Sequence, residues 1–271
     1  SSVCNGNTLT IGVSQSGETK DTLEALKDAK EEGSHISSFC NVIGSTMSRF
    51  TSNGAYLHAG PEFAVASTKC FTSMIAVFSL LSLTIPGMKE KDRNELISEL
   101  RRIPNKITNQ LMRSDDAIQE AANLISSSES VIFVGRGISS PLSREGALKM
   151  MEIAYIPSLS FPGGELKHGP IALIEDGTPV VAISPIDETI SLMESTIREC
   201  KSRGARIILI SDSDGNISDL ADIHIPTLKT HSCLSPLINS IPLQLLSYQV
   251  GILRGTEIDR PRNLAKSVTV S

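Results

Sequence analysis

Two stretches of this chain share one pattern 170 positions apart, and this internal repeat constrains the fold more than any other feature. Residues 8–19 read TLTIGVSQSGET, and residues 178–189 read TPVVAISPIDET. In both places a short apolar run leads into a polar loop. A helical pattern follows that stops at a glycine, Gly33 or Gly204, before a further apolar run. A repeated supersecondary unit of this kind indicates two related lobes in one chain.

Strand-like and helix-like segments alternate in both lobes, which predicts an α/β fold. Strands are expected near residues 8–13, 36–42 and 56–59 in the first lobe, and near residues 131–134, 158–161, 180–184, 207–211 and 223–225 in the second. Helices are expected near residues 19–32, 66–83, 141–154, 188–203 and 235–253. Helices between short apolar strands imply parallel sheets that are covered on both faces.

The domain boundaries follow from this alternation and from a change in composition. Residues 89–127 are charge-rich and amphipathic, so they are expected to form two helices, interrupted at Pro104, that connect the lobes. The first lobe is then 1–88, the second is 128–259, and 260–271 is a C-terminal tail. A strand, a helix and a second strand precede the repeated unit in the second lobe, but only seven residues precede it in the first. The first lobe is therefore expected to lack its opening β-α-β.

The composition argues against several classes of protein. The formal net charge of −5 and the absence of Trp disfavour a surface for nucleic acid or for an anionic membrane. The five Cys residues form no CxxC pair, which is typical of reduced thiols in a cytoplasmic protein. The five His residues are not spaced as metal ligands, so we expect no metal and no other cofactor. The longest apolar run, residues 74–85, is too short to span a bilayer.

The loop after the first strand is rich in small polar residues. Ser14, Gln15, Ser16 and Thr19 precede a helical pattern, where free backbone N–H groups, the helix dipole and hydroxyl donors suit a phosphate. A helix cap and turn with no ligand is the alternative. In the second lobe Asp187 stands in the corresponding loop and would repel an anion, so we expect one anion site, in the first lobe.

Three charged residues near the start of the second lobe share one helical face. Glu145, Lys149 and Glu152 are spaced by four and three residues, and His168 follows in a glycine-rich loop. Such groups could transfer protons on a small polar substrate. The alternative is a solvated, salt-bridged helix and a surface loop. A second face of this helix, suited to packing, comprises Ala147, Leu148, Met151 and Ala154.

Five motifs together resemble one family. The segments SQSGET, VASTK, EGALK, GGELKHGP and DRPRNLAKSVTV resemble the sugar isomerase (SIS) domains of the glutamine–fructose-6-phosphate aminotransferases, or glucosamine-6-phosphate synthases, from about residue 8 to the C-terminus. The resemblance implies two flavodoxin-like SIS lobes that convert fructose 6-phosphate and ammonia to glucosamine 6-phosphate. It also implies a homodimer and an N-terminal glutamine amidotransferase domain that supplies ammonia; no such domain is visible in this sequence.

The resemblance assigns roles to individual residues. The substrate-binding positions that it implies are Ser14, Gln15, Ser16, Thr19, Val65, Ser67, Glu145, Arg262 and Ala265. Glu152 matches the carboxylate that moves a proton between C1 and C2, and Lys149 lines the same pocket. His168 matches the histidine that opens the sugar ring and comes from the neighbouring subunit. Lys266 matches a Schiff-base lysine, a role that suits a buried amine of lowered pKa.

Two alternatives remain open, a related enzyme and a protein of another class. One is a phosphosugar deglycase or deaminase built from two SIS lobes, against which the intact tail argues. The other is a non-catalytic module that senses phosphosugars. Glu152, His168 and Lys266 argue against a sensor, because a sensor needs only the phosphate loop.

Overall fold

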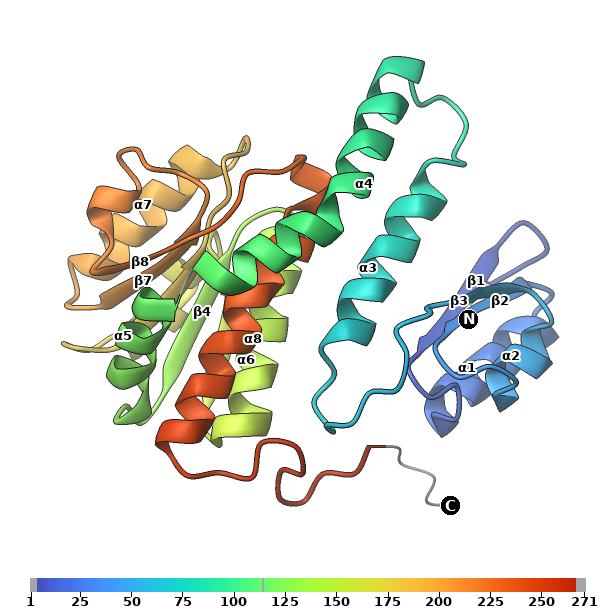
Figure 1. Cartoon of the computed structure of the whole chain (residues 1–271), viewed down its shortest axis with the longest axis horizontal. Helices are drawn as coiled ribbons and strands as arrows, with labels where there is room; N and C mark the ends of the chain where they lie inside the picture. Colours follow the sequence, from blue (N-terminus) through green and yellow to red (C-terminus); the bar gives the residue numbers. More distant parts are fainter. Residues whose placement is uncertain (1–3, 114, 267–271) are drawn as a thin grey trace. The chain divides into compact units, whose positions relative to one another are not determined.

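The computed structural model describes residues 4–113 and 115–266, and the chain divides into two compact units (Figure 1). Among the described residues, unit 1 comprises 4–85 and 262–266, and unit 2 comprises 86–261. The C-terminal tail is therefore grouped with the first unit, and the charge-rich stretch 89–127 with the second.

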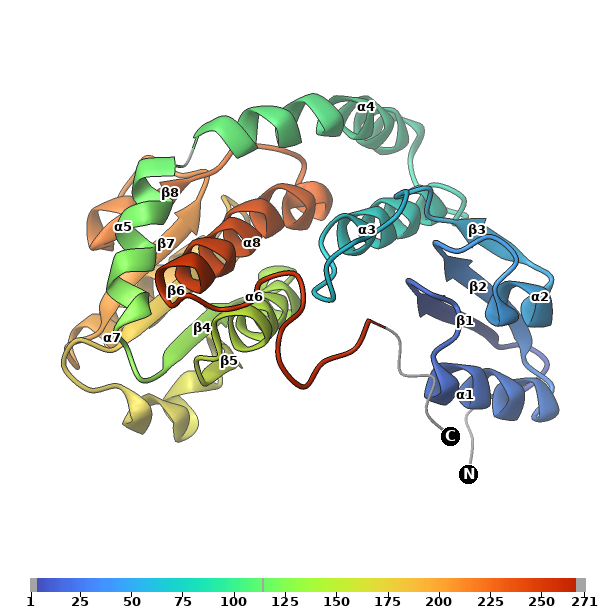
Figure 2. The ribbon, with the colours of Figure 1, turned by 60° about the horizontal axis from the view of Figure 1, so that its bottom comes forward.

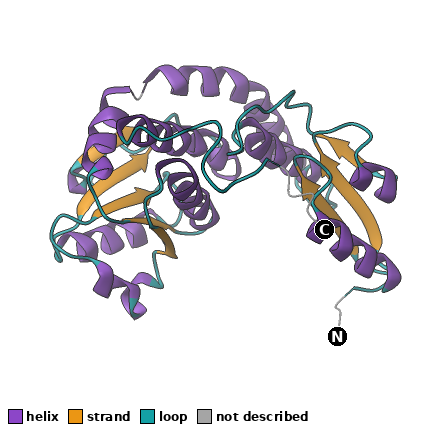
Figure 3. Ribbon diagram, turned by 90° about the horizontal axis from the view of Figure 1, so that it is seen from below, coloured by secondary structure: helices purple, strands orange, loops and turns teal. Residues whose placement is uncertain are grey.

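Unit 1 is built on a three-stranded parallel sheet in the order β1–β2–β3. Its elements are β1 (Leu9–Ser14), α1 (Lys20–Glu31), β2 (His35–Cys40), α2 (Thr46–Thr51), β3 (Gly54–Tyr56) and α3 (Lys69–Ser82). Helices α1 and α2 cover one face, where Leu26 and Met47 pack on Cys40. Helix α3 covers the other face, where Cys70 packs with Phe39 and Leu57. The apolar strands are thus shielded on both faces, as a parallel sheet requires (Figure 3).

Unit 2 has a five-stranded parallel sheet in the order β5–β4–β6–β7–β8. Its strands are β4 (Val131–Gly135), β5 (Ser158–Pro162), β6 (Pro179–Ile183), β7 (Arg206–Ser211) and β8 (Ile223–Pro226). Its helices are α4 (Glu90–Arg113), α5 (Asp115–Ser126), α6 (Ser139–Ala154), α7 (Ile190–Lys201) and α8 (Ser235–Leu253). Every residue of β4 and β6 is buried, so unit 2 holds a continuous core.

The two faces of the second sheet are covered by different helices. Met193 and Ile197 of α7 pack against Ile132 and Val180 of the sheet. On the other face α6 and α8 lie side by side (Figure 2). Gly146 of α6 allows this close approach, because a Cβ there would meet Leu243 of α8 and Phe133 of β4.

The observed elements confirm the α/β fold class and its internal repeat. Helix α1 begins at Lys20 and α7 at Ile190, which is the 170-residue offset of the sequence pattern. Strands β1, β2 and β3 lie in the same order as β6, β7 and β8. The described part of unit 1 holds no counterpart of β4, α6 and β5, so the expectation of an absent opening β-α-β agrees with the three-stranded sheet.

The helix break predicted at Pro104 is wrong. Helix α4 runs through Pro104 without interruption from Glu90 to Arg113. A proline inside a helix removes one backbone hydrogen bond, but α4 is anchored elsewhere by tertiary contacts. Gln110 is fully buried; its side-chain amide donates to the Pro226 carbonyl at 3.0 Å and accepts from the Leu228 N–H at 2.9 Å.

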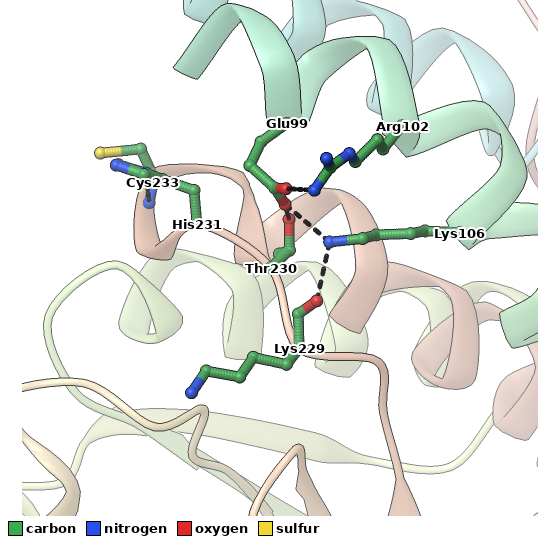
Figure 4. Close-up of polar contacts among 7 residues, drawn as sticks. All are labelled: Glu99, Arg102, Lys106, Lys229, Thr230, His231 and Cys233. Carbon is green, nitrogen blue, oxygen red and sulfur yellow. Dashed lines mark hydrogen bonds and ion pairs between the residues drawn. The ribbon is translucent and has the colours of Figure 1, made fainter. Parts of the chain in front are cut away.

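A polar cluster also fastens α4 to the segment that precedes α8 (Figure 4). The Glu99 carboxylate accepts hydrogen bonds from Lys106 at 2.6 Å, Arg102 at 3.0 Å and Thr230 at 3.2 Å. Lys106 also donates to the Lys229 carbonyl at 2.8 Å. The hydrogen bond from Lys106 is the main reason that the pKa of Glu99 is lowered. Of the helices that the structure describes, none is long and apolar enough to cross a membrane.

We predict that Gly135→Ala destabilises unit 2. The added Cβ would collide with the Ser139 carbonyl in the first turn of α6, and backbone atoms cannot move aside as a side-chain end can. Chemical denaturation should show a loss of about 1–3 kcal/mol in unfolding free energy. Gly215→Ala is the control, because its Cβ would meet only Ser213 Oγ at 3.6 Å. Equal stability of the two variants would contradict this account.

Candidate functional site

The loop at residues 14–19 joins β1 to α1 and gathers hydroxyl groups at the start of the helix. The Ser14 Oγ accepts from the Gly17 N–H at 2.9 Å and lies 3.3 Å from the Thr19 hydroxyl. The Ser16 Oγ accepts from the Glu18 N–H at 3.1 Å. Gly17 has φ +68° and lies against Ser45, where a Cβ would collide. The loop is therefore a tight, glycine-dependent turn that holds the hydroxyls of Ser14 and Thr19 together.

The N-cap residues of α1 and α3 make no side-chain capping hydrogen bond, but α3 has the Glu62 carboxylate beside its first residues and α1 has no such partner among the described residues. Thr19, at its start, makes no capping hydrogen bond. At the start of α2, Ser45 accepts from the Ser48 N–H and Glu18 accepts from the Thr46 N–H at 2.8 Å. An uncapped first turn has free N–H groups and a positive dipole end, which together favour an anion.

The corresponding loop of unit 2 is already filled by its own carboxylates. Asp187 accepts from both the N–H and the hydroxyl of Thr189 at 2.7 Å. Asp212 accepts from the Ile186 N–H at 2.7 Å. These acidic groups occupy the donors that a phosphate would need and repel a second anion.

A buried carboxylate, Glu62, lies at the start of α3. It is only 8 % exposed. It accepts hydrogen bonds from the Ser67 hydroxyl at 3.0 Å, the Thr68 N–H at 2.7 Å and the Thr68 hydroxyl at 3.3 Å. Burial alone would raise the pKa of Glu62, but these bonds and those from Cys70 outweigh burial and lower the pKa. Glu62 is therefore ionised at neutral pH and neutralises the N-terminus of α3.

Cys70, in the first turn of α3, is fully buried next to Glu62. Burial, together with the Glu62 carboxylate as hydrogen-bond partner and as a negative charge, raises the pKa of Cys70 to about 12. The positive charges of Lys69 and Lys266 act in the opposite direction. The thiol is thus protonated, and the ammonium of Lys266 lies near enough to influence it.

A pocket of about 490 Å³ in unit 1 adjoins these groups. Gln15 and Glu62 line it, together with Asn41, Val42, Ile43, His58, Gly60 and Pro61. Asn41 fixes the pocket wall, since its amide donates to the Gly60 carbonyl at 2.7 Å and accepts from the Ala59 N–H at 2.9 Å. The pocket offers space beside the anion-favouring loop.

The remaining sequence-predicted residues of unit 1 lie in two segments. Val65 and Ser67 are half-buried just before α3. Arg262, Ala265 and Lys266 are exposed. The buried surroundings expected for a Schiff-base lysine are therefore not seen at Lys266, because in this structure the tail segment lies on the surface of its unit.

In unit 2, helix α6 brings the three predicted charged residues together. The Lys149 ammonium lies 2.5 Å from a Glu152 oxygen and 3.4 Å from a Glu145 oxygen. The side chain of Lys149 is 4 % exposed, that of Glu145 14 % and that of Glu152 22 %. A solvated salt-bridged helix would expose these groups, so the geometry rules out that alternative for this stripe.

The charges in this cluster do not cancel. Burial raises the pKa of Glu145, with a smaller contribution from the negative charge of Glu152, and the ammonium of Lys149 only partly opposes this. One buried cation is thus shared by two carboxylates. Partly buried carboxylates beside a shared ammonium are the kind of groups that proton-transfer chemistry uses.

The packing face predicted for α6 is only half right. Ala147 and Ala154 are buried, but Leu148 and Met151 are each 42 % exposed. The helix packs through another row of residues, comprising Leu142, Ser143, Gly146, Ala147, Met150, Ile153 and Ala154. This row faces β4 and α8, so Leu148 and Met151 lie on the solvent-exposed face of α6.

His168 lies at the end of a short 3₁₀ helix, Leu166–His168, and is exposed. Leu166 is buried and anchors this segment in the core. The imidazole makes no hydrogen bond to any residue that the structure describes. His168 is therefore presented to its surroundings without an internal partner. No group of three or more metal-ligand side chains occurs within residues 4–113 and 115–266.

Sequence reasoning did not find Glu62, Cys70 or Asn41. An available signal was the segment GPEFAVASTK, in which an acidic residue precedes an apolar helix. Acidic side chains favour helix N-termini. The contacts of Asn41 with the loop at residues 59–60 depend on the tertiary path of the chain and have no local signature.

Comparison with known proteins agrees with this geometry. The SIS domain family matches residues 2–84 and 124–254. The chain belongs to the SIS domain family.

Two similar proteins are named as fructose-6-phosphate aminotransferases. The glutamine–fructose-6-phosphate aminotransferase [isomerizing] of Chlorobaculum tepidum is 43 % identical over 99 % of this chain, which spans 44 % of that relative's length. The C-terminal domain of the glucosamine-fructose-6-phosphate aminotransferase of Francisella tularensis is similar at a TM-score of 0.90 and 35 % identity, over 96 % of this chain and 74 % of that one.

A solved deaminase shares the fold alone. The glucosamine-6-phosphate deaminase of Thermotoga maritima has a TM-score of 0.78 at 21 % identity, over 98 % of this chain and 77 % of that one.

We predict that Lys149→Met destabilises the protein strongly at pH 7. Without the ammonium, two partly buried carboxylates face one another uncompensated, which typically costs about 3–5 kcal/mol. The loss should shrink toward pH 4, because Glu145, whose pKa is raised by burial, then becomes protonated and no longer repels Glu152. Denaturant unfolding at both pH values is the measurement. Lys27→Met removes the exposed pair Lys27–Glu24 and should change little; a similar loss in both variants would refute the proposed role of burial.

Proposed function

We propose that this chain is the isomerase part of a glucosamine-6-phosphate-forming aminotransferase, acting on fructose 6-phosphate and ammonia. The buried Glu145–Lys149–Glu152 cluster carries this proposal. A protein that only bound a phosphosugar would need no partly buried pair of carboxylates around one ammonium in addition to its phosphate loop. The C-terminal domain from Francisella tularensis supports the same assignment by its likeness over nearly the whole chain.

The proposed chemistry divides among a few residues. The loop at residues 14–19 binds the phosphate, and Ser67 and Val65 contact the sugar. His168 opens the ring by acid–base catalysis. Lys266 forms a Schiff base with the open ketone. Glu152, the most exposed carboxylate of its cluster, then takes a proton from C1 and returns it to C2, while Lys149 holds it in place.

The source of ammonia and the assembly are also proposals. The curated relatives are more than twice as long as this chain, which leaves room in them for a glutamine amidotransferase domain. Such a domain would release ammonia from glutamine. A homodimer would let the exposed His168 of each subunit serve the other subunit. A cytoplasmic location fits the described cysteines, which form no disulfide.

A deaminase or a phosphosugar sensor is the second candidate. The deaminase from Thermotoga maritima shows that two SIS lobes occur with that chemistry, but its low identity supports the fold alone. The NLAKS segment with Lys266 favours the aminotransferase. An assay for glucosamine 6-phosphate formed from fructose 6-phosphate and added ammonium separates an enzyme from a sensor, because a sensor would form none.

We predict that Glu152→Gln abolishes isomerisation while the affinity for fructose 6-phosphate stays within a few-fold. A missing general base typically costs about 10²–10⁴ in rate, and the carboxylate acts on the transition state rather than on the phosphate. Fructose/glucose 6-phosphate interconversion and calorimetric binding give the two readouts. Glu31→Gln, an exposed change on α1, is the matched control. Unchanged turnover in Glu152→Gln would eliminate it as the base.

We predict that two inactive variants complement one another if His168 acts across a dimer. In a mixture of His168→Ala and Glu152→Gln subunits, half of the dimers are hybrids with one intact and one doubly damaged site. About a quarter of the wild-type turnover should therefore return. Differently tagged subunits, purified over both tags, confirm hybrid formation. Hybrids with no activity beyond that of the parents would place His168 in its own subunit's site or outside the chemistry.

A further inference from the structure

The contact between Glu62 and Ser67 determines what Ser67 can bind. An ionised carboxylate has only acceptor atoms, and a serine hydroxyl has a single proton. At 3.0 Å, Ser67 must donate that proton to the Glu62 Oε2. Ser67 can therefore offer only its lone pairs to a ligand.

Because the Ser67 hydroxyl can only accept a hydrogen bond from a ligand, it distinguishes the sugar hydroxyls of a sugar phosphate from its phosphate group. A phosphate dianion has no proton to donate, so its oxygens would meet the lone pairs of Ser67 unfavourably. A sugar hydroxyl can donate to Ser67 without difficulty. Thr68 is similarly committed, since its hydroxyl donates to the Glu62 Oε1 at 3.3 Å. This end of the site is thus suited to hydroxyls and unsuited to phosphate.

The same carboxylate removes a competing anion site. Helix α3 has 14 residues, and its N-terminus would attract a phosphate if it were free. Glu62 already accepts the Thr68 N–H there at 2.7 Å and lies against Cys70. Helix α1, with its uncapped start at Thr19, keeps its anion-favouring character.

We propose that Glu62 is a positioning residue that sets the orientation of the sugar phosphate in unit 1. By holding Ser67 as a hydrogen-bond acceptor and by neutralising α3, it directs a sugar hydroxyl to Ser67 and leaves the phosphate to the loop at residues 14–19. Gln15 of that loop and Glu62 line the same pocket of about 490 Å³. The inference rests on the proposed binding of a sugar phosphate by unit 1, but not on the catalytic steps.

Calorimetry with two ligands tests this inference. Fructose 6-phosphate carries both ends of the ligand, and inorganic phosphate carries only one. Glu62→Gln keeps the shape of the side chain but gives Ser67 an amide N–H as a possible neighbour, and Ser67→Ala removes the acceptor. Each variant should weaken fructose 6-phosphate binding about tenfold, as expected for one lost hydrogen bond to a buried group. Phosphate affinity should stay within about twofold in Ser67→Ala and should not fall in Glu62→Gln, because loss of the carboxylate also frees the N-terminus of α3.

Two further variants sharpen the result. The double variant Glu62→Gln/Ser67→Ala should bind fructose 6-phosphate no more weakly than Ser67→Ala alone, because Glu62 acts through Ser67. Ser16→Ala in the phosphate loop is the opposite control and should weaken the binding of both ligands. Ser67→Ala, which leaves the carboxylate in place, keeps the test valid if Glu62→Gln folds poorly.

Several outcomes would overturn the inference. Parallel losses for both ligands in Glu62→Gln would show that Glu62 only supports the fold. Additive losses in the double variant would show that it does not act through Ser67. A wild-type chain that binds neither ligand would overturn this inference together with the proposed function. Normal selectivity without any isomerase activity would instead overturn the proposed function and leave the inference standing.

Discussion

Parallel pairing of the strands is the constraint on which the rest of this molecule depends. Because all strands of a sheet point the same way, their carboxyl ends meet at one edge, and the loops that follow them gather there. In unit 1 this edge carries the hydroxyl loop after β1. In unit 2, helix α6 begins at this edge, directly after β4. The segment that contains His168 also starts there, directly after β5. The loop at residues 14–19 and the segment of His168 therefore follow from strand direction, whereas Glu152 lies in the last turn of α6 and is placed by that helix.

Acidic side chains then decide which helix ends remain open. Glu18 serves the start of α2, Glu62 that of α3, and Asp187 the turn before α7. Each of these carboxylates accepts a hydrogen bond from a backbone N–H group that could otherwise bind an anion from solution. The start of α1 is left without such a partner, and there the loop supplies neutral hydroxyls instead. The distribution of carboxylates thus makes the corresponding loops of the two lobes electrostatically different, although both lobes have the same architecture.

The positions of the repeated helices could be predicted from sequence. Which helical face packs, and whether a helix continues through a proline, could not. The repeat located α1 and α7 well because apolar periodicity is a local property. The exposed Leu148 and the unbroken helix at Pro104 escaped prediction, because a neighbouring element decides which helical face packs and whether a lost backbone bond is tolerated. Glu145, Lys149 and Glu152 were correctly placed together by helical spacing, but their burial depends on the surrounding fold.

The environment of Cys70 has a consequence for the chemical durability of unit 1. Thiols are alkylated and oxidised as thiolates, and a pKa of about 12 keeps Cys70 protonated at pH 7. Glu62, which orders the start of α3, therefore also shields a sulfur beside the proposed sugar site. Cys233, by contrast, is exposed on unit 2, far along the sequence from the loop at residues 14–19. Peroxide or electrophiles would modify that surface thiol while the buried Cys70 beside the proposed sugar site stays intact.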